Sequence, residues 1–343
     1  MVDIFLHIGA EKCGSSSIQR VFSRNRKALK AQGILYPYCF GWVNHTKIAA
    51  YAQDEGKVDS IRKLFGLTTR EEIEKFRPEL EENLWRELKN DEYNKIVISN
   101  EHCSSRLTTR DELITLKNFL SMFSENIKII FYVRPQDEAI TSSYSTQVKS
   151  GGIDDFKFPL TFENAPYSFK YYQIAELWSS VFGLENLNVV PLHKSIYGVN
   201  DAVRRFFYLL QFPDNNIDYQ GKSNESLDIY KLWFLKGVNK YFPLFESGSF
   251  NRRRSRIVSS LERSPPLGPN LTASFKERER VLKYFSHENS QLFKKYCGIN
   301  ENVFSKPDDN KQEVALPNAV DSDLIFKLVS DLFENYDENY LKK

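Results

Sequence analysis

The chain has 343 residues, of which 47 are Lys or Arg and 45 are Asp or Glu, for a formal net charge of +2. A charge this close to balance gives no global attraction for nucleic acid, so we expect no nucleic-acid partner. No stretch approaches 18 uninterrupted apolar residues and the N-terminus lacks signal-peptide features, which predicts no integral membrane segment and favours a cytoplasmic protein. Cys13, Cys39, Cys103 and Cys297 lack Cys-x-x-Cys spacing, which argues against a zinc site and fits reduced thiols.

The first predicted element is a strand over residues 3–8, followed by a turn and a helix from Ser15 to about Gln32. Glycines in the turn let the backbone approach an anion, and the N–H groups of the new helix point at that anion with the positive end of the helix dipole. Lys12 adds a positive charge. The run predicts a phosphate-binding loop; the simpler alternative is an ordinary strand, turn and helix with a solvated lysine.

The position of the lysine distinguishes between kinds of phosphate loop. A Walker A loop, G-x-x-x-x-G-K-[ST], with Gly9 and Gly14 as its glycines would place the lysine at position 15, where this chain has Ser15. Lys12 instead precedes the second glycine. The spacing therefore disfavours an ATP-type loop, although a P-loop kinase or nucleotidase stays open as an alternative.

Residues 34–60 are rich in aromatic side chains and are predicted to be irregular. Within them Tyr36, Tyr38, Phe40 and Trp42 alternate along the chain, which indicates either a face packed on the core or a surface that stacks on sugar rings. The pattern beyond predicts, in order, a helix over 69–88, a strand over 95–99, a helix over 110–123 and a strand over 127–133.

A second candidate phosphate motif begins where that last strand ends, at Arg134. The continuous apolar run before it indicates a strand covered on both faces. Pro135 then opens a helix that is predicted to continue to about residue 149 and carries Ser142 and Tyr144. An arginine suits phosphate because its planar fork can donate two parallel hydrogen bonds. The alternative is that Arg-Pro merely opens a surface helix.

The C-terminal half continues the alternation of helices and strands. Its predicted elements are helices over 170–182, 199–211 and 322–336, a helix near 275–297, a strand over 188–192 and a linker over 305–318. Residues 221–228 are a helix start. The densest basic patch, which indicates either an anion-attracting cleft or a solvated loop, consists of Arg252, Arg253, Arg254 and Arg256.

These elements together predict an α/β, three-layer P-loop-like fold with a central parallel sheet flanked by helices, plus helical elaborations. We expect a single domain over residues 1–300 with a helical insertion at about 36–92. Residues 301–343 are then a linker and a C-terminal helix packed on the domain. A ligand should bind beyond the carboxyl ends of the strands, where both candidate phosphate motifs fall.

Lys12-Cys13-Gly14-Ser15-Ser16 resembles the 5′-phosphosulfate loop of sulfotransferases that use 3′-phosphoadenosine 5′-phosphosulfate (PAPS), whose pattern is Lys-[Ser/Thr]-Gly-[Ser/Thr]-[Ser/Thr]. Cys13 departs from that pattern. Arg134 and Ser142, eight residues apart, resemble the pair that holds the 3′-phosphate in the same family. Further segments that resemble bacterial carbohydrate sulfotransferases are 25–37, 96–105, 144–152 and 171–190.

The resemblance assigns roles to these residues. It implies that the donor is held by Lys12, Cys13, Gly14, Ser15, Ser16, Ser17, Arg134 and Ser142. A glutamate after the corresponding strand is the base in related carbohydrate enzymes, which makes Glu101 the preferred catalytic base and leaves His102 as its rival. Alternatively, Glu101 only caps the segment near Ser104. A sulfuryl group carries less charge than a phosphoryl group, so Lys12 should suffice as the catalytic cation and we expect no metal.

Two further residues are expected to contact the acceptor by the same resemblance, namely His45 and Tyr144. The simpler interpretation of His45 is a lone loop histidine. A C-terminal segment closes over the nucleotide in family members, and 221–228 or the arginine patch is the candidate here.

The resemblance therefore implies a PAPS-dependent carbohydrate sulfotransferase of the EC 2.8.2 type. The reaction moves a sulfuryl group to a hydroxyl of a carbohydrate acceptor, expected to be a cell-surface polysaccharide or its precursor, and releases 3′-phosphoadenosine 5′-phosphate. Peripheral association with glycan-assembly machinery stays open. The alternatives are a P-loop nucleotide kinase and a nucleotide-binding protein without sulfotransferase activity. The acceptor sugar and the oligomeric state cannot be inferred from the sequence.

Overall fold

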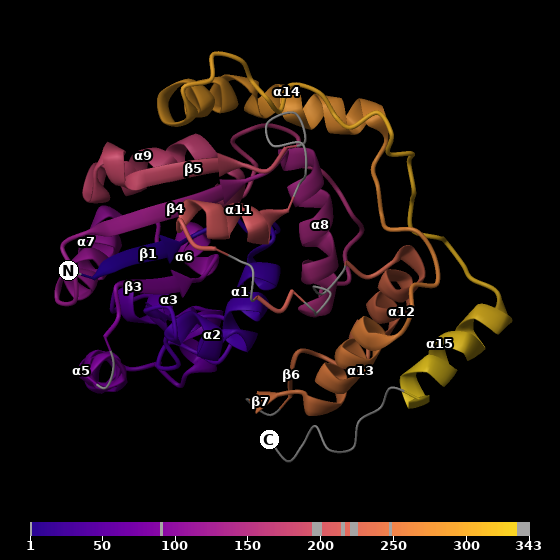
Figure 1. The fold of residues 1–343 in the computed structure, drawn as a ribbon. Helices are drawn as coiled ribbons and strands as arrows, with labels where there is room; N and C mark the ends of the chain where they lie inside the picture. The colour runs from indigo at the N-terminus through magenta and orange to yellow at the C-terminus, as the bar shows by residue number, and fades with distance from the viewer. Residues whose placement is uncertain are drawn as a thin grey trace. The chain divides into compact units, whose positions relative to one another are not determined.

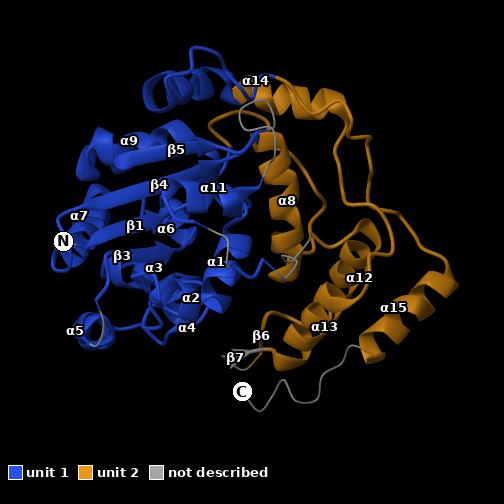
Figure 2. Cartoon of the chain, in the orientation of Figure 1, with its two compact units in different colours: residues 1–135, 165–223, 285–305 blue, residues 136–164, 224–284, 306–343 orange. Residues whose placement is uncertain are grey.

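The computed structural model describes residues 2–89, 92–193, 201–213, 217–219, 226–246 and 249–334. The chain divides into two compact units, shown in blue and orange in Figure 2. Unit 1 comprises residues 1–135, 165–223 and 285–305, and unit 2 comprises 136–164, 224–284 and 306–343. The domain boundary expected near residue 300 and the insertion expected at 36–92 stay predictions.

Unit 1 is built on a parallel five-stranded sheet in the order β2-β3-β1-β4-β5 (Figure 1). Its strands are β1 (Asp3–His7), β2 (Ile34–Leu35), β3 (Lys95–Ser99), β4 (Ile127–Val133) and β5 (Leu187–Pro191). The strand β1 lies between β3 and β4, and His7 at its end pairs with Ser99 at the end of β3. The chain segments that leave β1, β3 and β4 therefore start side by side at one edge of the sheet.

Helices cover both faces of this sheet. Adjacent residues on a strand point to opposite faces, so the neighbours of Phe131 and Tyr132 identify the two layers. The Phe131 ring contacts Tyr171 of α9, whereas the Tyr132 ring contacts Phe206 of α11. Phe22 of α1 also packs on Phe206, which places α1 in the same layer as α11. The predicted α/β fold with a central parallel sheet flanked by helices is confirmed.

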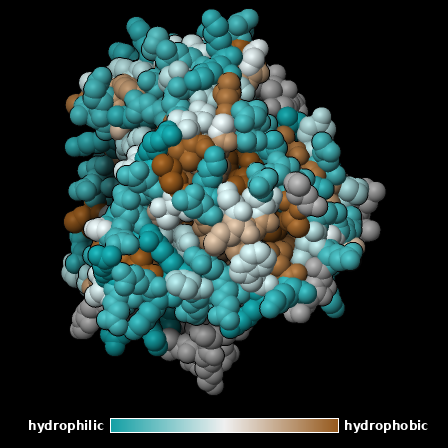
Figure 3. Space-filling view, turned by 90° about the vertical axis from the view of Figure 1, so that its left-hand side faces the viewer, coloured by the Kyte–Doolittle hydropathy of each residue, from teal (hydrophilic) through white to brown (hydrophobic). Residues whose placement is uncertain are grey.

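The helices of unit 1 are α1 (Ser15–Arg24), α2 (Arg26–Lys30), α3 (Thr46–Ala52), α4 (Ser60–Leu64), α5 (Arg70–Leu88), α6 (His102–Arg106), α7 (Arg110–Ser121), α9 (Tyr171–Phe182) and α11 (Ala202–Leu209). Shorter turns are η1 (Tyr167–Phe169), η2 (Leu184–Asn186) and the π turn η3 (Phe293–Cys297). Hydrophilic residues predominate on the face shown in Figure 3, with apolar residues gathered in patches between them.

Two sequence predictions for unit 1 require correction. The single helix expected from Ser15 to Gln32 is two helices, because the chain leaves helical geometry at Asn25, whose side-chain amide bonds the carbonyl of Val21. Residues 34–60 are not wholly irregular, since they contain β2 and α3 and end at the first residue of α4. The helix expected over 69–88 is confirmed as α5, which Thr69 and Glu72 open with a capping box.

Unit 2 is helical. It contains α8 (Gln136–Lys149), α12 (Ile229–Asn239), α13 (Arg252–Arg263), α15 (Ser322–Glu334) and the short strands β6 (Phe245–Glu246) and β7 (Ser249–Phe250). The helix α14 (Phe275–Leu292) begins in unit 2, and its residues from 285 onward belong to unit 1. The core of unit 2 joins Tyr144 and Val148 of α8 to Leu235 of α12, Leu261 of α13 and Leu328 of α15. The C-terminal helix is thus packed on α13.

The arginine patch lies on a helix and is not the solvated loop considered from the sequence. Asn251 caps α13 through the backbone N–H of Arg254, so the patch forms the first turns of that helix. Arg254 is only 2% exposed and donates to the carbonyls of Val148 and Lys149 at the end of α8 and to Asn239 of α12. A helix end leaves carbonyls without partners, and this arginine satisfies two of them. Arg254 therefore joins three helices.

Asp137 makes the stability of the protein depend on pH. Its side chain is fully buried in the first turn of α8, and Arg278 is 3.8 Å away. Burial, followed by the negative charge of Glu138, raises the pKa of Asp137 from 3.8 to about 6. The folded protein therefore holds this proton more tightly than the unfolded chain, and stability falls as pH rises from about 4 to about 6.

We expect Asp137→Asn to stabilise the protein at pH 7.5 by about 1–3 kcal/mol and to have a smaller effect at pH 4.5. The measurement is the free energy of unfolding in urea at both pH values. The exposed Asp309→Asn serves as control and should show no such difference. An Asp137→Asn variant that is equally destabilised at both pH values would contradict this account.

Candidate functional site

The loop between β1 and α1 ends in a helix start that no side chain caps. Gly14 occupies the cap position of α1 in a left-handed conformation, with φ of 83°, and no side-chain hydrogen bond caps the helix. The backbone N–H groups of the first turn lack intrahelical partners in any helix, and the helix dipole makes that end positive. A ten-residue helix that begins in this way is suited to bind an anion.

The backbone of the loop is strained at Lys12. Lys12 has φ of 71°, which a residue with a side chain rarely adopts and which costs about 1 kcal/mol or more. Cys13 between the two left-handed residues is 1% exposed, so its thiol is turned into the protein, and its backbone N–H donates to the carbonyl of Ala10 over 3.2 Å. This burial gives a physical reason why cysteine is tolerated where the resembling loops have a hydroxyl. Ser15 is also buried, whereas Ser16 is exposed and Ser17 half-buried.

Two buried polar atoms lie beneath this loop without a hydrogen-bond partner among the described residues. They are Nε2 of His7 and Oγ of Ser15. A Cβ placed on Gly9 would lie 2.6 Å from the first atom and 3.3 Å from the second, so only glycine fits there. Burial lowers the pKa of His7 to about 3, which keeps the ring neutral, and its Nδ1 lies 2.9 Å from Oγ of Ser99. Unpartnered polar atoms beside an uncapped helix fit an anionic group such as phosphate.

Arg134, the first residue of the second candidate phosphate motif, is hydrogen-bonded to the loop that carries Lys12. Its Nη1 donates to the carbonyl of Lys12 over 3.0 Å, and the backbone N–H of Ala10 bonds the carbonyl of Tyr132 over 2.8 Å. Both contacts follow from the pairing of β1 with β4, which sets the two loops side by side. A guanidinium carries five N–H donors, so one bond to the loop is compatible with a phosphate contact.

Glu101 lies at the same edge of the sheet, between β3 and α6. Its Oε2 accepts from Nε2 of Gln19 over 2.6 Å, and its Oε1 accepts from Nδ2 of Asn44 over 3.4 Å. The carboxylate makes no cap bond to α6, so the capping alternative is wrong. One amide donor on each oxygen fixes the orientation of the carboxylate and leaves further lone pairs on both atoms.

His102, the rival base, faces a different carboxylate. Its Nδ1 lies 3.7 Å from Oε1 of Glu11. Burial disfavours the charged imidazole, but Glu11 and the negative charge of Glu101 outweigh it, and the pKa of His102 is raised. The pKa of Glu11 is lowered to about 2, because the contacts with His102 and Ser105 outweigh burial. His102 therefore has a carboxylate neighbour of its own in Glu11, and the choice between Glu101 and His102 as the base stays a prediction.

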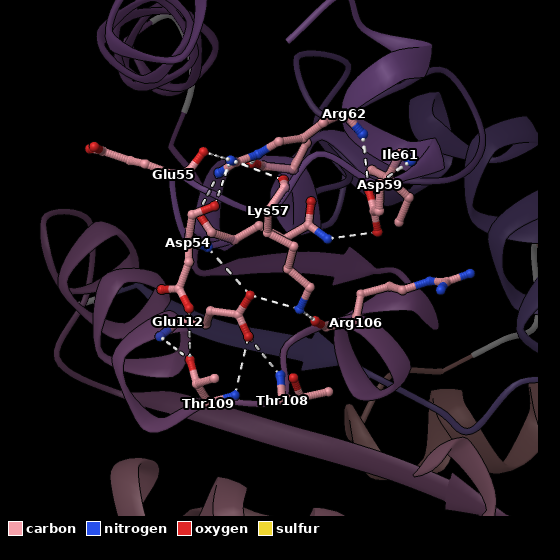
Figure 4. Close-up of polar contacts among 12 residues, drawn as sticks. Asp54, Glu55, Lys57, Asp59, Ile61, Arg62, Arg106, Thr108, Thr109 and Glu112 are labelled. Carbon is pink, nitrogen blue, oxygen red and sulfur yellow. Dashed lines mark hydrogen bonds and ion pairs between the residues drawn. The ribbon is translucent and has the colours of Figure 1, made fainter. Parts of the chain in front are cut away.

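A polar network contacts the C-terminal end of α6 (Figure 4). Lys57 donates to the carbonyl of Arg106, the last residue of α6, and to Oε1 of Glu112 over 2.9 Å. The segment that carries Lys57 is itself fixed by the buried guanidinium of Arg62, which donates to the carbonyls of Gln53, Asp54, Glu55 and Lys57. The position of α6, and hence of Glu101 at its start, depends on this network.

The other predicted site residues have different surroundings. His45 is fully buried, its Nδ1 accepts the backbone N–H of Ser99 over 3.2 Å, and burial lowers its pKa to about 3.

Ser142 and Tyr144 lie on α8 in unit 2. The Ser142 Oγ is 3.3 Å from Oγ of Ser226, and the Tyr144 hydroxyl donates to the carbonyl of Asp154. Acceptor contact by His45 and Tyr144, and phosphate contact by Ser142, stay predictions. Residues 221–225 of the predicted closing segment lie outside the described residues.

Three residues at the site were not singled out from the sequence. His7 interrupts an apolar strand at its carboxyl end, which is the position where a buried polar residue suggests a function. Gln19 lies on the buried face of α1 beside Ile18 and Phe22, and a polar residue on such a face was the available signal. Asn44 contacts Glu101 across 57 positions of sequence, and no local pattern indicates it.

Within the described ranges, no group of three or more His, Cys, Asp or Glu side chains is arranged to hold a metal ion. Reaction without a metal stays a prediction. None of the described helices is both long enough and apolar enough to cross a membrane.

Comparison with solved structures finds a similar bacterial protein. A sulfotransferase from Alicyclobacillus acidocaldarius is similar over 70% of this chain and 93% of its own, with a TM-score of 0.40 and 15% sequence identity. No family model matches the chain, and no curated protein matches it.

The loop geometry predicts that Gly14→Ala destabilises the protein. A Cβ at Gly14 would lie 2.9 Å from Cβ of Ala202 in α11, and the left-handed backbone adds about 1 kcal/mol of strain. Gly66 is a matched control because its φ is also positive, at 69°, and nothing lies within 4 Å of its Cβ position. We expect Gly14→Ala to lose at least about 1 kcal/mol more than Gly66→Ala in urea unfolding. Adding Ala202→Gly should recover part of the loss, and equal losses at both glycines would refute the close contact.

Proposed function

We propose that this protein is a sulfotransferase that uses PAPS as donor. The observation that carries the proposal is the hydrogen bond from Arg134 to the carbonyl of Lys12, which joins the two candidate phosphate motifs at one edge of the sheet. A loop with a cation and an uncapped helix end suits one phosphate, and a guanidinium beside it suits a second. PAPS carries phosphate at both its 5′ and 3′ positions.

The loop residues hold the 5′-phosphosulfate in this proposal. Lys12 supplies charge, and the backbone N–H groups from Gly14 to Ser16 donate to the oxygens, whereas the N–H of Ser17 already donates to the carbonyl of Gly14. Arg134 holds the 3′-phosphate in this proposal. The donor supplies an activated sulfuryl group on its 5′-phosphate.

Glu101 is the general base of the proposed reaction. Its carboxylate takes the proton of the acceptor hydroxyl while that oxygen forms a bond to sulfur. The bond from sulfur to the bridging phosphate oxygen breaks, and its electron pair stays on 3′-phosphoadenosine 5′-phosphate. Negative charge builds on that oxygen, and Lys12 with the loop amides stabilises it. Gln19 and Asn44 keep the base oriented.

The acceptor in this proposal is a hydroxyl of a carbohydrate, as expected for a surface polysaccharide or its precursor, and the reaction takes place in the cytoplasm. The support is the resemblance of segments throughout residues 25–190 to bacterial carbohydrate sulfotransferases. The nature of the sugar is set by loops around the site.

Nucleotide binding is the first test. We expect 3′,5′-ADP to raise the melting temperature of the protein more than ATP with Mg²⁺ at equal concentration, because only the former carries a 3′-phosphate for Arg134. Lys12→Ala and Arg134→Ala should each weaken binding of 3′,5′-ADP by about tenfold or more. Lys30→Ala and Arg24→Ala are controls of matched charge that should bind normally. A larger shift with ATP and Mg²⁺ would favour a kinase instead.

Transfer of labelled sulfate from PAPS to a panel of glycans is the second test. We expect Glu101→Gln to lower the rate about 10²–10⁴-fold while binding of 3′,5′-ADP is retained, because the amide cannot accept the proton. His102→Asn should lower the rate less. The rate should not change in a chelator. If Glu101→Gln keeps most of the activity, the base lies elsewhere.

A further inference from the structure

The alternating aromatic residues near the site divide into a buried pair and an exposed pair. Tyr36 and Phe40 are 1% and 0% exposed and belong to the core, whereas Tyr38 and Trp42 are 49% and 70% exposed. The rings of the exposed pair lie 5.0 Å apart. Two neighbouring exposed rings offer a surface on which another ring can pack.

The exposed pair is held rigidly from beneath by Arg26. This arginine is 8% exposed, and its guanidinium carbon lies 3.9 Å from the centre of the Tyr38 ring. It also donates to the carbonyls of Tyr36 over 2.8 Å, Pro37 over 3.3 Å and Gly41 over 3.4 Å. The segment that carries the two rings is thus ordered before any ligand arrives, which lowers the entropic cost of binding.

The same segment is connected directly to the candidate base. The Tyr36 hydroxyl donates to the carbonyl of Val43 over 2.7 Å, and Ser23 Oγ donates to the carbonyl of Trp42 over 2.9 Å. Asn44 then donates to Glu101 and accepts from Asn100 Nδ2 over 2.5 Å. Trp42 and Asn44 are two residues apart, so their Cα atoms lie within about 7 Å. The segment that carries the exposed rings is therefore continuous in sequence with Asn44, which contacts Glu101.

We propose that Tyr38 and Trp42 form a stacking platform for a pyranose ring of the acceptor and so determine which saccharides reach Glu101. The inference rests on the proposed function for the role of Glu101. One face of a pyranose consists of C–H groups that pack well on an aromatic ring, while its hydroxyls stay in water. Rigid Trp and Tyr side chains provide such contact area at low entropic cost.

Direct binding to glycans tests the platform without any nucleotide. The probes are cellotetraose, chitotetraose and a heparosan tetrasaccharide, which present neutral, amino and acidic pyranoses. We expect the wild-type protein to bind at least one of them by titration calorimetry, and Trp42→Ala and Tyr38→Ala to weaken that binding by about tenfold. Tyr208→Ala is the matched control, because Tyr208 is 69% exposed on α11, and it should bind as the wild type does.

Folding of the variants is checked by melting temperature, which should change by no more than about 2 °C because both side chains are exposed. Wild-type protein that binds none of the three probes, or Trp42→Ala and Tyr38→Ala variants that both bind as tightly as wild type, would overturn the platform.

Acceptor kinetics separate this inference from the proposed function. If sulfate is transferred, Trp42→Ala should raise the acceptor KM about tenfold and change kcat and the KM for PAPS by less than about threefold. Unchanged acceptor KM in an active enzyme refutes the platform and leaves the sulfotransferase standing. Glycan binding that depends on Trp42 in a protein without transfer activity supports the platform and refutes the proposed function.

Discussion

The parallel pairing of β1 with β3 on one side and β4 on the other is the constraint on which the site depends. It brings residues from positions 12, 101 and 134 to one edge of the sheet, although they are up to 122 positions apart in sequence. Because the register pairs His7 with Ser99, the loop that follows β1 and Glu101, which follows β3, start at the same level of the sheet. The hydrogen bond from Arg134 to the carbonyl of Lys12 then joins the segment that follows β4 to the loop that follows β1. A slip of β4 against β1 would separate the phosphate motifs, and a slip of β3 against β1 would displace Glu101.

The site also concentrates features that a stable fold otherwise avoids. Lys12 has a left-handed backbone, α1 starts without a capping side chain, and buried polar atoms of His7 and Ser15 lack partners among the described residues. Each costs stability, and their gathering around one loop is typical of a site prepared for a ligand. The surrounding structure compensates with firm anchoring, as Lys57 and Arg62 show for α6 (Figure 4).

The sequence predicted the elements whose residues follow one pattern and missed those set by tertiary contacts. The strands at 95–99 and 127–133 were identifiable because their apolar runs are buried on both faces, and α5 because its apolar residues, such as the buried Ile73, Leu80 and Leu84, recur at helical spacing. The break between α1 and α2 at Asn25 was not identifiable from the sequence, because it depends on the Asn25 side chain hydrogen-bonding to the backbone. Arg254 looked like surface charge because its carbonyl partners are more than 100 positions away. Gln19 and Asn44 were missed because their partner, Glu101, is 82 and 57 positions away in the sequence.

We propose that one nucleotide is held at both of its phosphate ends, by Lys12 at the 5′ end and by Arg134 at the 3′ end. Phosphorus NMR of bound 3′,5′-ADP resolves the two phosphates and tests this claim directly. The wild-type protein should shift both resonances, Lys12→Ala should reduce the shift of the 5′-phosphate, and Arg134→Ala should reduce that of the 3′-phosphate. Both substitutions affecting the same resonance, or neither resonance moving in the wild-type protein, would contradict the account.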